Sequence, residues 1–449
     1  MSGVPPAAAS RFPTSLVLLF ALIVLAQLAT YVLPAGEFER DRGRVIQGTF
    51  HQVQADPLPP LTFLTAIPKG LADAQDIIFF VLIVGGVIAV MRATGALDAV
   101  IGVAIRRLGS RPALLIGGMV LVFAIGSSTI GMAEEYVAFV PLLVAMCAAL
   151  GMDAVVAVGI IYVGAGVGYG CAALNPFTVL IAQDIAGLAP TSGQSVRWLL
   201  MLGCSAVGVH HLVRYVRRTN TKTTISTTHK MAGAVELGTR HLLVLAAFVL
   251  GVGVFVSGAM TRGWYLGELT AILLGLALVT AVVGRLGPNA VANEFCRGAT
   301  ELTTTALLIG FARTIQVVLA EGQVIDTVIH GLAQPLEGLP SFVAALGMLV
   351  VQTACNFVIP SGSGQALVTM PIMVPLADLT NVTRQTAVLA YQFGDGFTNM
   401  IVPTNAVLMG ILALGQIPYE RWVRFILPLL VKLYIVAVLA LAAAVEFGY

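Results

Sequence analysis

The stretch Gly394–Val407, GDGFTNMIVPTNAV, interrupts an apolar run that extends from Thr386 to Ala413. Gly394, Gly396 and Pro403 are expected to break helical hydrogen bonding, and the stretch also contains the polar residues Asp395, Thr398, Asn399, Thr404 and Asn405. Unpaired backbone groups are costly in hydrocarbon, so irregular backbone survives at membrane depth only where it is buried or lines a cavity. We therefore predict two half-helices that meet at a polar break, as in the binding sites of secondary transporters.

A second stretch, Gly164–Val179, GAGVGYGCAALNPFTV, shows the same succession of paired glycines, small residues, Asn and Pro. Gly164 and Gly394 are 230 positions apart (394 − 164 = 230), and Asn175 and Asn405 have the same separation (405 − 175 = 230). Chance is the alternative in a chain with 47 glycines, but ordered markers at one spacing disfavour it. The pattern indicates an ancient internal repeat.

The composition identifies the class of protein. The chain has 449 residues, of which 58% are hydrophobic and only 10% are charged, as in an integral membrane protein surrounded by a lipid bilayer. A net charge of +2 does not provide a nucleic-acid-binding surface, so no nucleic-acid partner is predicted. The five cysteines and six histidines show no metal-ligand spacing, and we predict no cofactor beyond a coupling Na⁺ or H⁺.

The apolar segments predict an all-α polytopic membrane protein built from two inverted-topology repeats. Each repeat is expected to hold a re-entrant helical hairpin and an interrupted transmembrane helix, and a full span with a loop is the alternative for the first hairpin. Amphipathic arms at 95–108 and 323–336 are expected to lie in the membrane interface. The predicted parts are 1–75, with a first transmembrane helix and an external loop at 34–60; 76–216, repeat 1, with hairpin 112–150 and broken helix 153–187; 217–299, a cytoplasmic linker loop and a connecting helix pair; and 300–449, repeat 2, with hairpin 341–379 and broken helix 384–416.

The distribution of basic residues predicts the orientation, since cytoplasmic loops are enriched in Lys and Arg. The loop 217–240 is basic, whereas the loop 321–340 contains acids and no Lys or Arg. These counts favour a cytoplasmic N-terminus, with the first loop inside and the second outside. The first hairpin then enters from the cytoplasm and the second from outside, so the repeats are inverted.

Two hairpin tips and two helix breaks make up the predicted binding site. The tips are the small polar segments 126–133 and 360–365, where a half-helix can offer free N–H groups and a positive dipole end to a carboxylate. Unwound carbonyls and Asn or Thr side chains at the breaks suit a cation or an ammonium group, while close helix packing is the alternative role of the small residues. The candidate substrate-binding residues are Glu134, Glu135, Asn175, Arg313, Ser361, Gly362, Ser363, Gly364, Gln365, Asp395, Asn399, Thr404 and Asn405, and a candidate sodium site lies near Gly164, Asn175, Gly394 and Asn405.

Charged residues at membrane depth are costly and therefore indicate function. Glu134 and Glu135 are expected to bind a cationic substrate, carry a proton or neutralise sodium, unless they cap a helix start near water. Asp395 is interpreted in the same way, with an ion pair to a buried Arg as its alternative. Arg313 lies within an apolar segment, so we expect it to pair with Asp395 or Glu134 or to contact a substrate anion.

Five motifs resemble one known family. They are GMAEE (131–135), NPFTVLIAQDIAGL (175–188), IPSGSGQALVTMPIMVPLAD (359–378), RQTAVLAYQFGDGFTN (384–399) and ALGQIPYERW (413–422). The chain resembles the YfcC-type proteins, a family named for basic amino acid antiport and grouped with the C4-dicarboxylate anaerobic carriers in the ion transporter superfamily. The resemblance implies inverted repeats with hairpins, elevator-type movement, a homodimer and the bacterial inner membrane.

The leading hypothesis is a secondary active transporter of a small amphoteric solute, a basic or zwitterionic amino acid, working by ion coupling or exchange. Its carboxylate would meet the tip at 360–365, and its amine or guanidinium would meet Glu134, Glu135 or Asp395. The alternative is a C4-dicarboxylate carrier with sodium or proton coupling. An intramembrane enzyme or a channel is a remoter alternative, and no HExxH or GxSxG motif supports an enzyme.

The predicted topology can be tested by labelling. Single cysteines replace Thr223 and Gln334 in a cysteine-free background, and intact cells are treated with a membrane-impermeant thiol reagent. We expect the cysteine at position 334 to react and that at position 223 to react only after the membrane is opened. Labelling of both from the same side would contradict the inverted arrangement.

Overall fold

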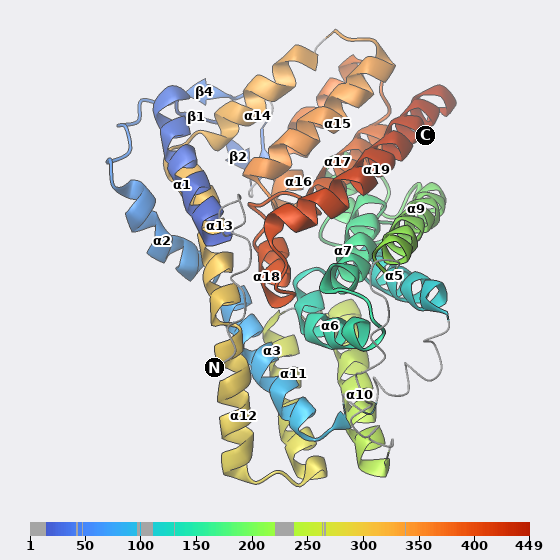
Figure 1. The fold of residues 1–449 in the computed structure, drawn as a ribbon. Helices are drawn as coiled ribbons and strands as arrows, with labels where there is room; N and C mark the ends of the chain where they lie inside the picture. The colour runs from blue at the N-terminus through green and yellow to red at the C-terminus, as the bar shows by residue number, and fades with distance from the viewer. Residues whose placement is uncertain are drawn as a thin grey trace.

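The computed structural model describes residues 15–41, 44–46, 48–96, 99, 111–129, 131–220, 238–262, 264, 266–336 and 338–449. The described chain is predominantly helical (Figure 1). Within these ranges, seven helices are long and apolar enough to cross a membrane, judged by length and composition. The predicted all-helical, multi-span class is therefore confirmed.

One order of elements occurs twice. A kinked helix pair is followed by two helical segments joined by a turn, then by an interrupted helix and a long helix. The first series is α2 (Thr62–Asp73), α3 (Gln75–Ala93), α5 (Pro112–Thr129), η1 (Glu134–Phe139), α6 (Val140–Ala149), α7 (Ala154–Gly170), α8 (Val179–Ile185) and α9 (Gln194–Asn220). The second is α12 (Pro288–Glu301), α13 (Thr303–Glu321), α14 (Ile325–Ala333), η2 (Gln334–Leu336), α15 (Ser341–Val358), α16 (Gly362–Leu379), α17 (Arg384–Thr398), α18 (Ala406–Leu414) and α19 (Tyr419–Phe447). Helix α1 (Ser15–Val32) precedes both, and α10 (Thr239–Arg262) and α11 (Leu266–Gly284) connect them.

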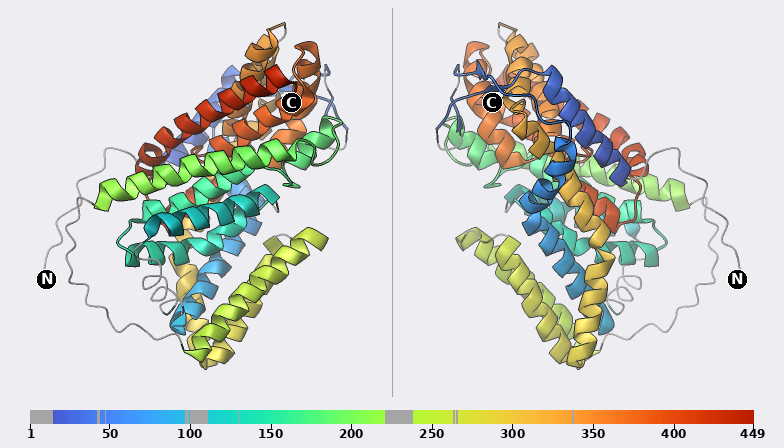
Figure 2. Two further views of the ribbon diagram at one scale, coloured as in Figure 1. Left: turned by 90° about the vertical axis from the view of Figure 1, so that its right-hand side faces the viewer. Right: turned by 90° about the vertical axis from the view of Figure 1, so that its left-hand side faces the viewer.

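The helices pack into two groups, and each group combines elements of both series. In one group α3 packs against α11 and α12, and α13 packs against α1 and α2. In the other, α5 packs on α7 and α15 on α17, while α7 and α17 contact each other (Figure 1). Helices α9 and α19 lie side by side on the outside of this second group (Figure 2). Helices α2 and α12 were not anticipated from the sequence.

The helix breaks lie later in the chain than the sequence predicts. Helix α7 continues to Gly170 and α17 to Thr398, so the irregular segments are 171–178 and 399–405. The expectation that Gly394 and Gly396 interrupt hydrogen bonding is wrong, because both glycines are helical. A Cβ on Gly394 would lie 2.4 Å from the Cβ of Gln352, and one on Gly396 would lie 2.2 Å from the Gly170 nitrogen. These glycines allow helices to approach closely.

The two predicted tips are shorter than expected. Ser127 and Ser128 belong to the last turns of α5, and the chain turns at 131–133 before η1. In the second tip the residues from Gly362 onward form the first turn of α16. Ser361 is its N-cap, and its hydroxyl accepts a hydrogen bond from the Gly364 N–H at 3.4 Å.

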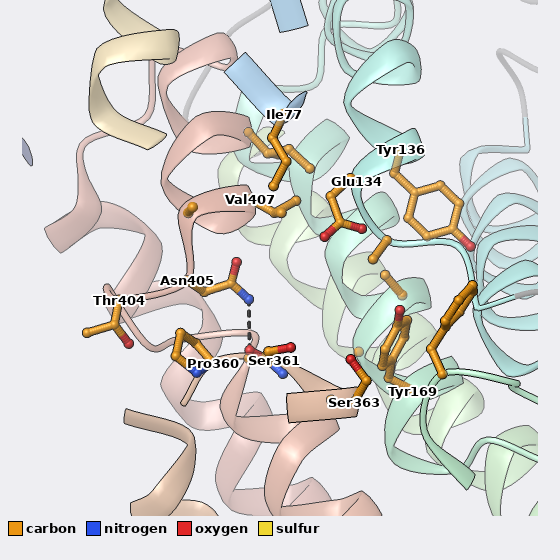
Figure 3. A pocket seen from close by; sticks show the side chains of 18 of the residues that line it. Ile77, Glu134, Tyr136, Tyr169, Pro360, Ser361, Ser363, Thr404, Asn405 and Val407 are labelled. Atoms are coloured by element: carbon orange, nitrogen blue, oxygen red, sulfur yellow. Dashed lines mark hydrogen bonds between the residues drawn. The ribbon is translucent and has the colours of Figure 1, made fainter. Parts of the chain in front are cut away.

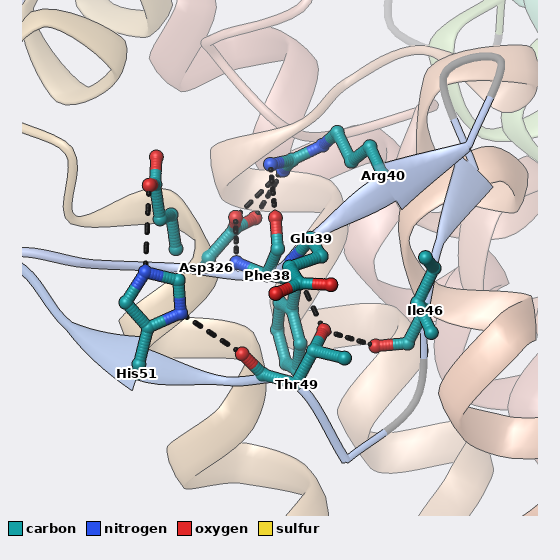
Figure 4. Close-up of polar contacts among 8 residues, drawn as sticks. Phe38, Glu39, Arg40, Ile46, Thr49, His51 and Asp326 are labelled. Carbon is teal, nitrogen blue, oxygen red and sulfur yellow. Dashed lines mark hydrogen bonds and ion pairs between the residues drawn. The ribbon is translucent and has the colours of Figure 1, made fainter.

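The loop at 34–60 contains two short pairs of strands. β1 (Gly36–Glu37) pairs with β4 (His51–Gln52), and β2 (Arg40–Asp41) pairs with β3 (Arg44–Val45), in both cases antiparallel. Arg40 Nη2 binds both carboxylate oxygens of Asp326 on α14, at 2.7 and 2.6 Å (Figure 4). The Phe50 ring stacks on the His330 ring with centroids 4.2 Å apart. These contacts hold the loop against the helical arm expected at 323–336, whereas most of the arm expected at 95–108 and most of the linker at 217–240 lie outside the described residues.

The contact between α3 and α12 generates a prediction. A Cβ on Gly298 would lie 2.2 Å from the Gly85 carbonyl oxygen, whereas one on Gly275 would have no heavy atom within 4 Å. We expect Gly298→Ala to lower stability by about 1–3 kcal/mol through overpacking. Gly275→Ala should be neutral or slightly stabilising. Thermal unfolding of both variants in detergent checks this, and equal midpoints would contradict the packing role of Gly298.

Candidate functional site

A cavity of about 350 Å³ lies where the two groups of helices meet (Figure 3). It is lined by both tips, by the second break, by Phe177 of the first break, by the kink between α2 and α3, and by part of α13. The structure therefore brings together segments that are far apart in sequence. Of the predicted site residues, those that line the cavity are Glu134, Arg313, Ser361, Gly362, Ser363, Asn399, Thr404 and Asn405.

Side-chain amides hold the second break in shape. Asn405 Oδ1 accepts a hydrogen bond from the Leu408 N–H at 3.1 Å and so caps α18. Asn405 Nδ2 donates to Asn399 Oδ1 at 2.8 Å, and Asn399 Nδ2 donates to Asp395 Oδ1 at 2.8 Å. Asn405 and Ser363 face the same space as the Glu134 carboxylate (Figure 3). Thr404 adds a buried hydroxyl that has no hydrogen-bond partner within the described part of the chain.

Arg313 forms an ion pair with Asp73, and its Nη1 donates to Gln316 Oε1 at 2.8 Å. The prediction that Arg313 pairs with Asp395 or Glu134 is therefore wrong. Helix α2 packs on α13 and ends at Asp73, which places a nearer carboxylate beside the guanidinium. Asp73 and Asp76 both line the cavity and were missed, although two acids beside an apolar segment were a visible signal.

The adjacent residues Glu134 and Glu135 have different surroundings. Glu134 lines the cavity. Glu135 is buried, 4% exposed, and its carboxylate accepts a hydrogen bond from the Ala133 N–H at 2.8 Å. Glu135 thus bonds to the backbone at the start of η1, which is the alternative role considered for both glutamates. Only Glu134 is placed to meet a solute in this structure.

Asn175 lies behind the first tip and does not line the cavity. It is fully buried, and its Nδ2 donates to the Ser127 carbonyl at 2.9 Å while its Oδ1 accepts from the Phe177 N–H at 2.8 Å. Gly164 packs against α5, where an added Cβ would lie 2.7 Å from the Phe123 Cβ. Gly164, Asn175 and Gly394 therefore make packing or hydrogen-bond contacts with other helices at the place where the sequence predicts a sodium site.

Asp395 and Gln365 lie behind the second tip, in a buried polar cluster. Asn356 Nδ2 donates to Gln365 Oε1 at 3.1 Å and to Asp395 Oδ1 at 3.0 Å. Gln365 Nε2 donates to Gln352 Oε1 at 2.7 Å. Asp395, Gln365 and Gly364 do not line the cavity. Asp395 and Gln365 support the tip from behind.

The chain is similar to several known proteins. Residues 12–446 match the family model described as DcuC, C4-dicarboxylate anaerobic carrier. The Escherichia coli (strain K12) protein named "Putative basic amino acid antiporter YfcC" is 30% identical, and an uncharacterized protein of Haemophilus influenzae is 28% identical, with 97% of each chain covered in both cases. Among solved structures, the Alcanivorax borkumensis YdaH transporter is 16% identical with a TM-score of 0.47, and the match covers 97% of this chain and 99% of that one.

The position of Asn175 generates a prediction. Asn175→Ala removes a buried hydrogen bond to Ser127 and leaves the Phe177 N–H without its acceptor, which should cost about 1–3 kcal/mol of stability. Ligand affinity of the folded protein should be unchanged, because Asn175 does not line the cavity. The control is Asn293→Ala on the exposed surface of α12, and both are measured by thermal unfolding and ligand titration. A selective loss of ligand affinity in Asn175→Ala would contradict a purely structural role.

Proposed function

The chain belongs to the C4-dicarboxylate anaerobic carrier (DcuC) family of membrane transporters, and we propose that it carries a small amphoteric solute, a basic or zwitterionic amino acid, by secondary active transport. The observation behind this proposal is the charge of the cavity. Its lining contains three carboxylates, of Asp73, Asp76 and Glu134, and one guanidinium, of Arg313. The carboxylates outnumber the guanidinium, so the lining is net negative and favours a cationic group.

The substrate carboxylate would bind at the opposite part of the cavity, at the start of α16. Ser361 caps this helix, and the backbone N–H groups of its first turn are of the kind that binds anions. The Gly362 carbonyl accepts a hydrogen bond from the Tyr391 hydroxyl at 2.6 Å, which holds the tip in place. The hydroxyls of Ser363 and Thr404 and the amide of Asn405 add neutral polar contacts.

A C4-dicarboxylate is the second candidate, supported by the description of the matching family model. Such a solute carries two carboxylates, and one of them would have to lie among Glu134, Asp73 and Asp76. That placement requires protons or cations to neutralise the acids. The acidic lining therefore favours an amino acid, in agreement with the name of the Escherichia coli relative.

We further propose alternating access between two inverted repeats, with elevator-type movement of the helices that carry the tips and breaks. The repeated order of elements supports this, and so does the reciprocal packing of α3 with α12 and of α13 with α2. The basic residues favour a cytoplasmic N-terminus in a bacterial inner membrane. Family resemblance adds the proposal of a homodimer.

Neutralising Glu134 tests the proposed substrate. Glu134→Gln should weaken the binding of arginine or lysine by more than about tenfold, because a charge-assisted hydrogen bond contributes roughly 1.5–3 kcal/mol. Binding of a zwitterion such as leucine should change less. The measurement is ligand titration of the purified protein, with Glu301→Gln on the exposed surface of α12 as control.

The same titrations distinguish the alternatives. If succinate binds and arginine and leucine do not, the protein is a dicarboxylate carrier. If arginine binds Glu134→Gln as tightly as the parent, Glu134 does not hold the cationic group, and the proposed orientation of the solute is wrong.

A further inference from the structure

Three buried oxygen atoms on the elements that meet near Asp395 have no hydrogen-bond partner within the described part of the chain. They are Asn356 Oδ1, Gln392 Oε1 and Thr178 Oγ1. Asn356 is 0% exposed, and Gln392 and Thr178 are each 1% exposed. A buried acceptor without a donor is costly, so three of them on elements that meet near one buried carboxylate require an explanation.

The orientation of the two amides is determined by their partners. Asn356 Nδ2 donates to two acceptors, Gln365 Oε1 and Asp395 Oδ1, and a flipped amide would place oxygen against oxygen. Gln392 Nε2 donates to the Ala172 carbonyl at 3.1 Å, which excludes the flipped form for the same reason. The unpartnered atoms of both side chains are therefore acceptors.

Thr178 is the N-cap of α8, yet its hydroxyl makes no capping hydrogen bond. An N-cap Thr usually accepts a hydrogen bond from the first turn of its helix, and here this contact is missing. A Cβ on Gly362 would lie 2.6 Å from Thr178 Cγ2 and 3.1 Å from Asp395 Oδ2. Thr178 and Asp395 therefore both lie against the same glycine of the second tip.

The four side chains belong to elements that meet at one junction. Asn356 bonds to Asp395 directly, and Gln392 lies one helical turn before Asp395 on α17. Thr178 belongs to the first break, and Gly362 belongs to the second tip. The first break, the second tip and α17 thus converge on a buried carboxylate with neutral acceptor oxygens near it.

We propose that Asp395, Asn356, Gln392 and Thr178 bind a monovalent cation, sodium. All the ligand atoms are oxygens, as hard cations require. Ca²⁺ sites usually contain several carboxylates, whereas the single carboxylate here matches a single positive charge. A proton on Asp395 would satisfy only one acceptor. Among the described residues no group of three or more His, Cys, Asp and Glu is placed to hold a transition metal.

Such a cation would couple to the solute. The Asp395 carboxylate lies against Gly362, at the start of the helix that is proposed to hold the substrate carboxylate. Without a cation the two negative charges repel each other, and with sodium bound this repulsion is cancelled. Sodium and substrate then raise each other's affinity by the same factor. This coupling rests on the proposed function, whereas cation binding by itself does not.

Sodium binding can be measured without substrate. The full-length protein, purified in detergent, is unfolded by heat in NaCl, KCl or choline chloride at constant ionic strength. We expect a melting midpoint that rises with sodium, saturates, and exceeds the midpoint in potassium or choline, because a ligand of the folded state stabilises it by mass action. Equal midpoints in sodium and choline would overturn the proposal, as would stabilisation that depends on pH alone.

Paired variants locate the site. Thr178→Val removes the hydroxyl at nearly constant volume and should weaken sodium binding by roughly tenfold, while Thr178→Ser retains the hydroxyl and should bind like the parent. Asp395→Asn should abolish the sodium response, and Thr300→Val on the exposed surface of α12 should leave it intact. If Asp395→Asn does not fold, the Thr178 pair decides, and equal affinity of its two variants would overturn the site.

Arginine titration of the same samples separates this inference from the proposed function. Arginine binding that is independent of sodium, with no sodium response, would overturn the cation site and leave the transport proposal standing. A sodium response without any amino acid binding would support the cation site and overturn the proposed amino acid substrate.

Discussion

The contact between α7 and α17 is the constraint on which the rest of the structure depends. The two interrupted helices cross where Gly170 and Gly396 bring backbone against backbone, and a Cβ on Gly170 would lie 2.5 Å from the Phe397 ring. Small residues allow such an approach inside a membrane, where packing and hydrogen bonding, not exclusion of water, hold helices together. Because α7 and α17 cross just before they end, both breaks lie at the same place, between the two tips.

The breaks expose backbone groups, and side chains from neighbouring elements satisfy them. The indole of Trp422 donates to the Met400 carbonyl at 2.8 Å, and the Tyr419 hydroxyl donates to the Ile401 carbonyl at 2.6 Å. In the first break, the Ser128 hydroxyl on α5 accepts a hydrogen bond from the Ala173 N–H at 3.0 Å. Irregular backbone is therefore supported on its protein side by α19 and α5, and its other side is left for the cavity.

The sequence predicted which segments meet but not how each residue is used. Polar breaks in apolar runs and a constant spacing of 230 positions identified the hairpins and interrupted helices. The breaks are informative because irregular backbone costs free energy in a membrane. The role of single glycines was not predictable, since one residue type both ends helices and packs them, and Gly394 packs. The partner of Arg313 was missed because it lies on α2, which was not anticipated. The different surroundings of Glu134 and Glu135 depend on one turn of η1, which periodicity does not specify.

The burial of Asp395 has an electrical consequence. This carboxylate is 1% exposed and belongs to α17, within the group of helices that carries the tips. Any displacement of that group along the membrane normal carries the charge at this position through the transmembrane field, which acts on one elementary charge with about 2.3 kcal/mol per 100 mV. A sodium ion bound at Asp395, as proposed, would cancel this charge, so the membrane potential would act differently on the sodium-bound and the sodium-free forms.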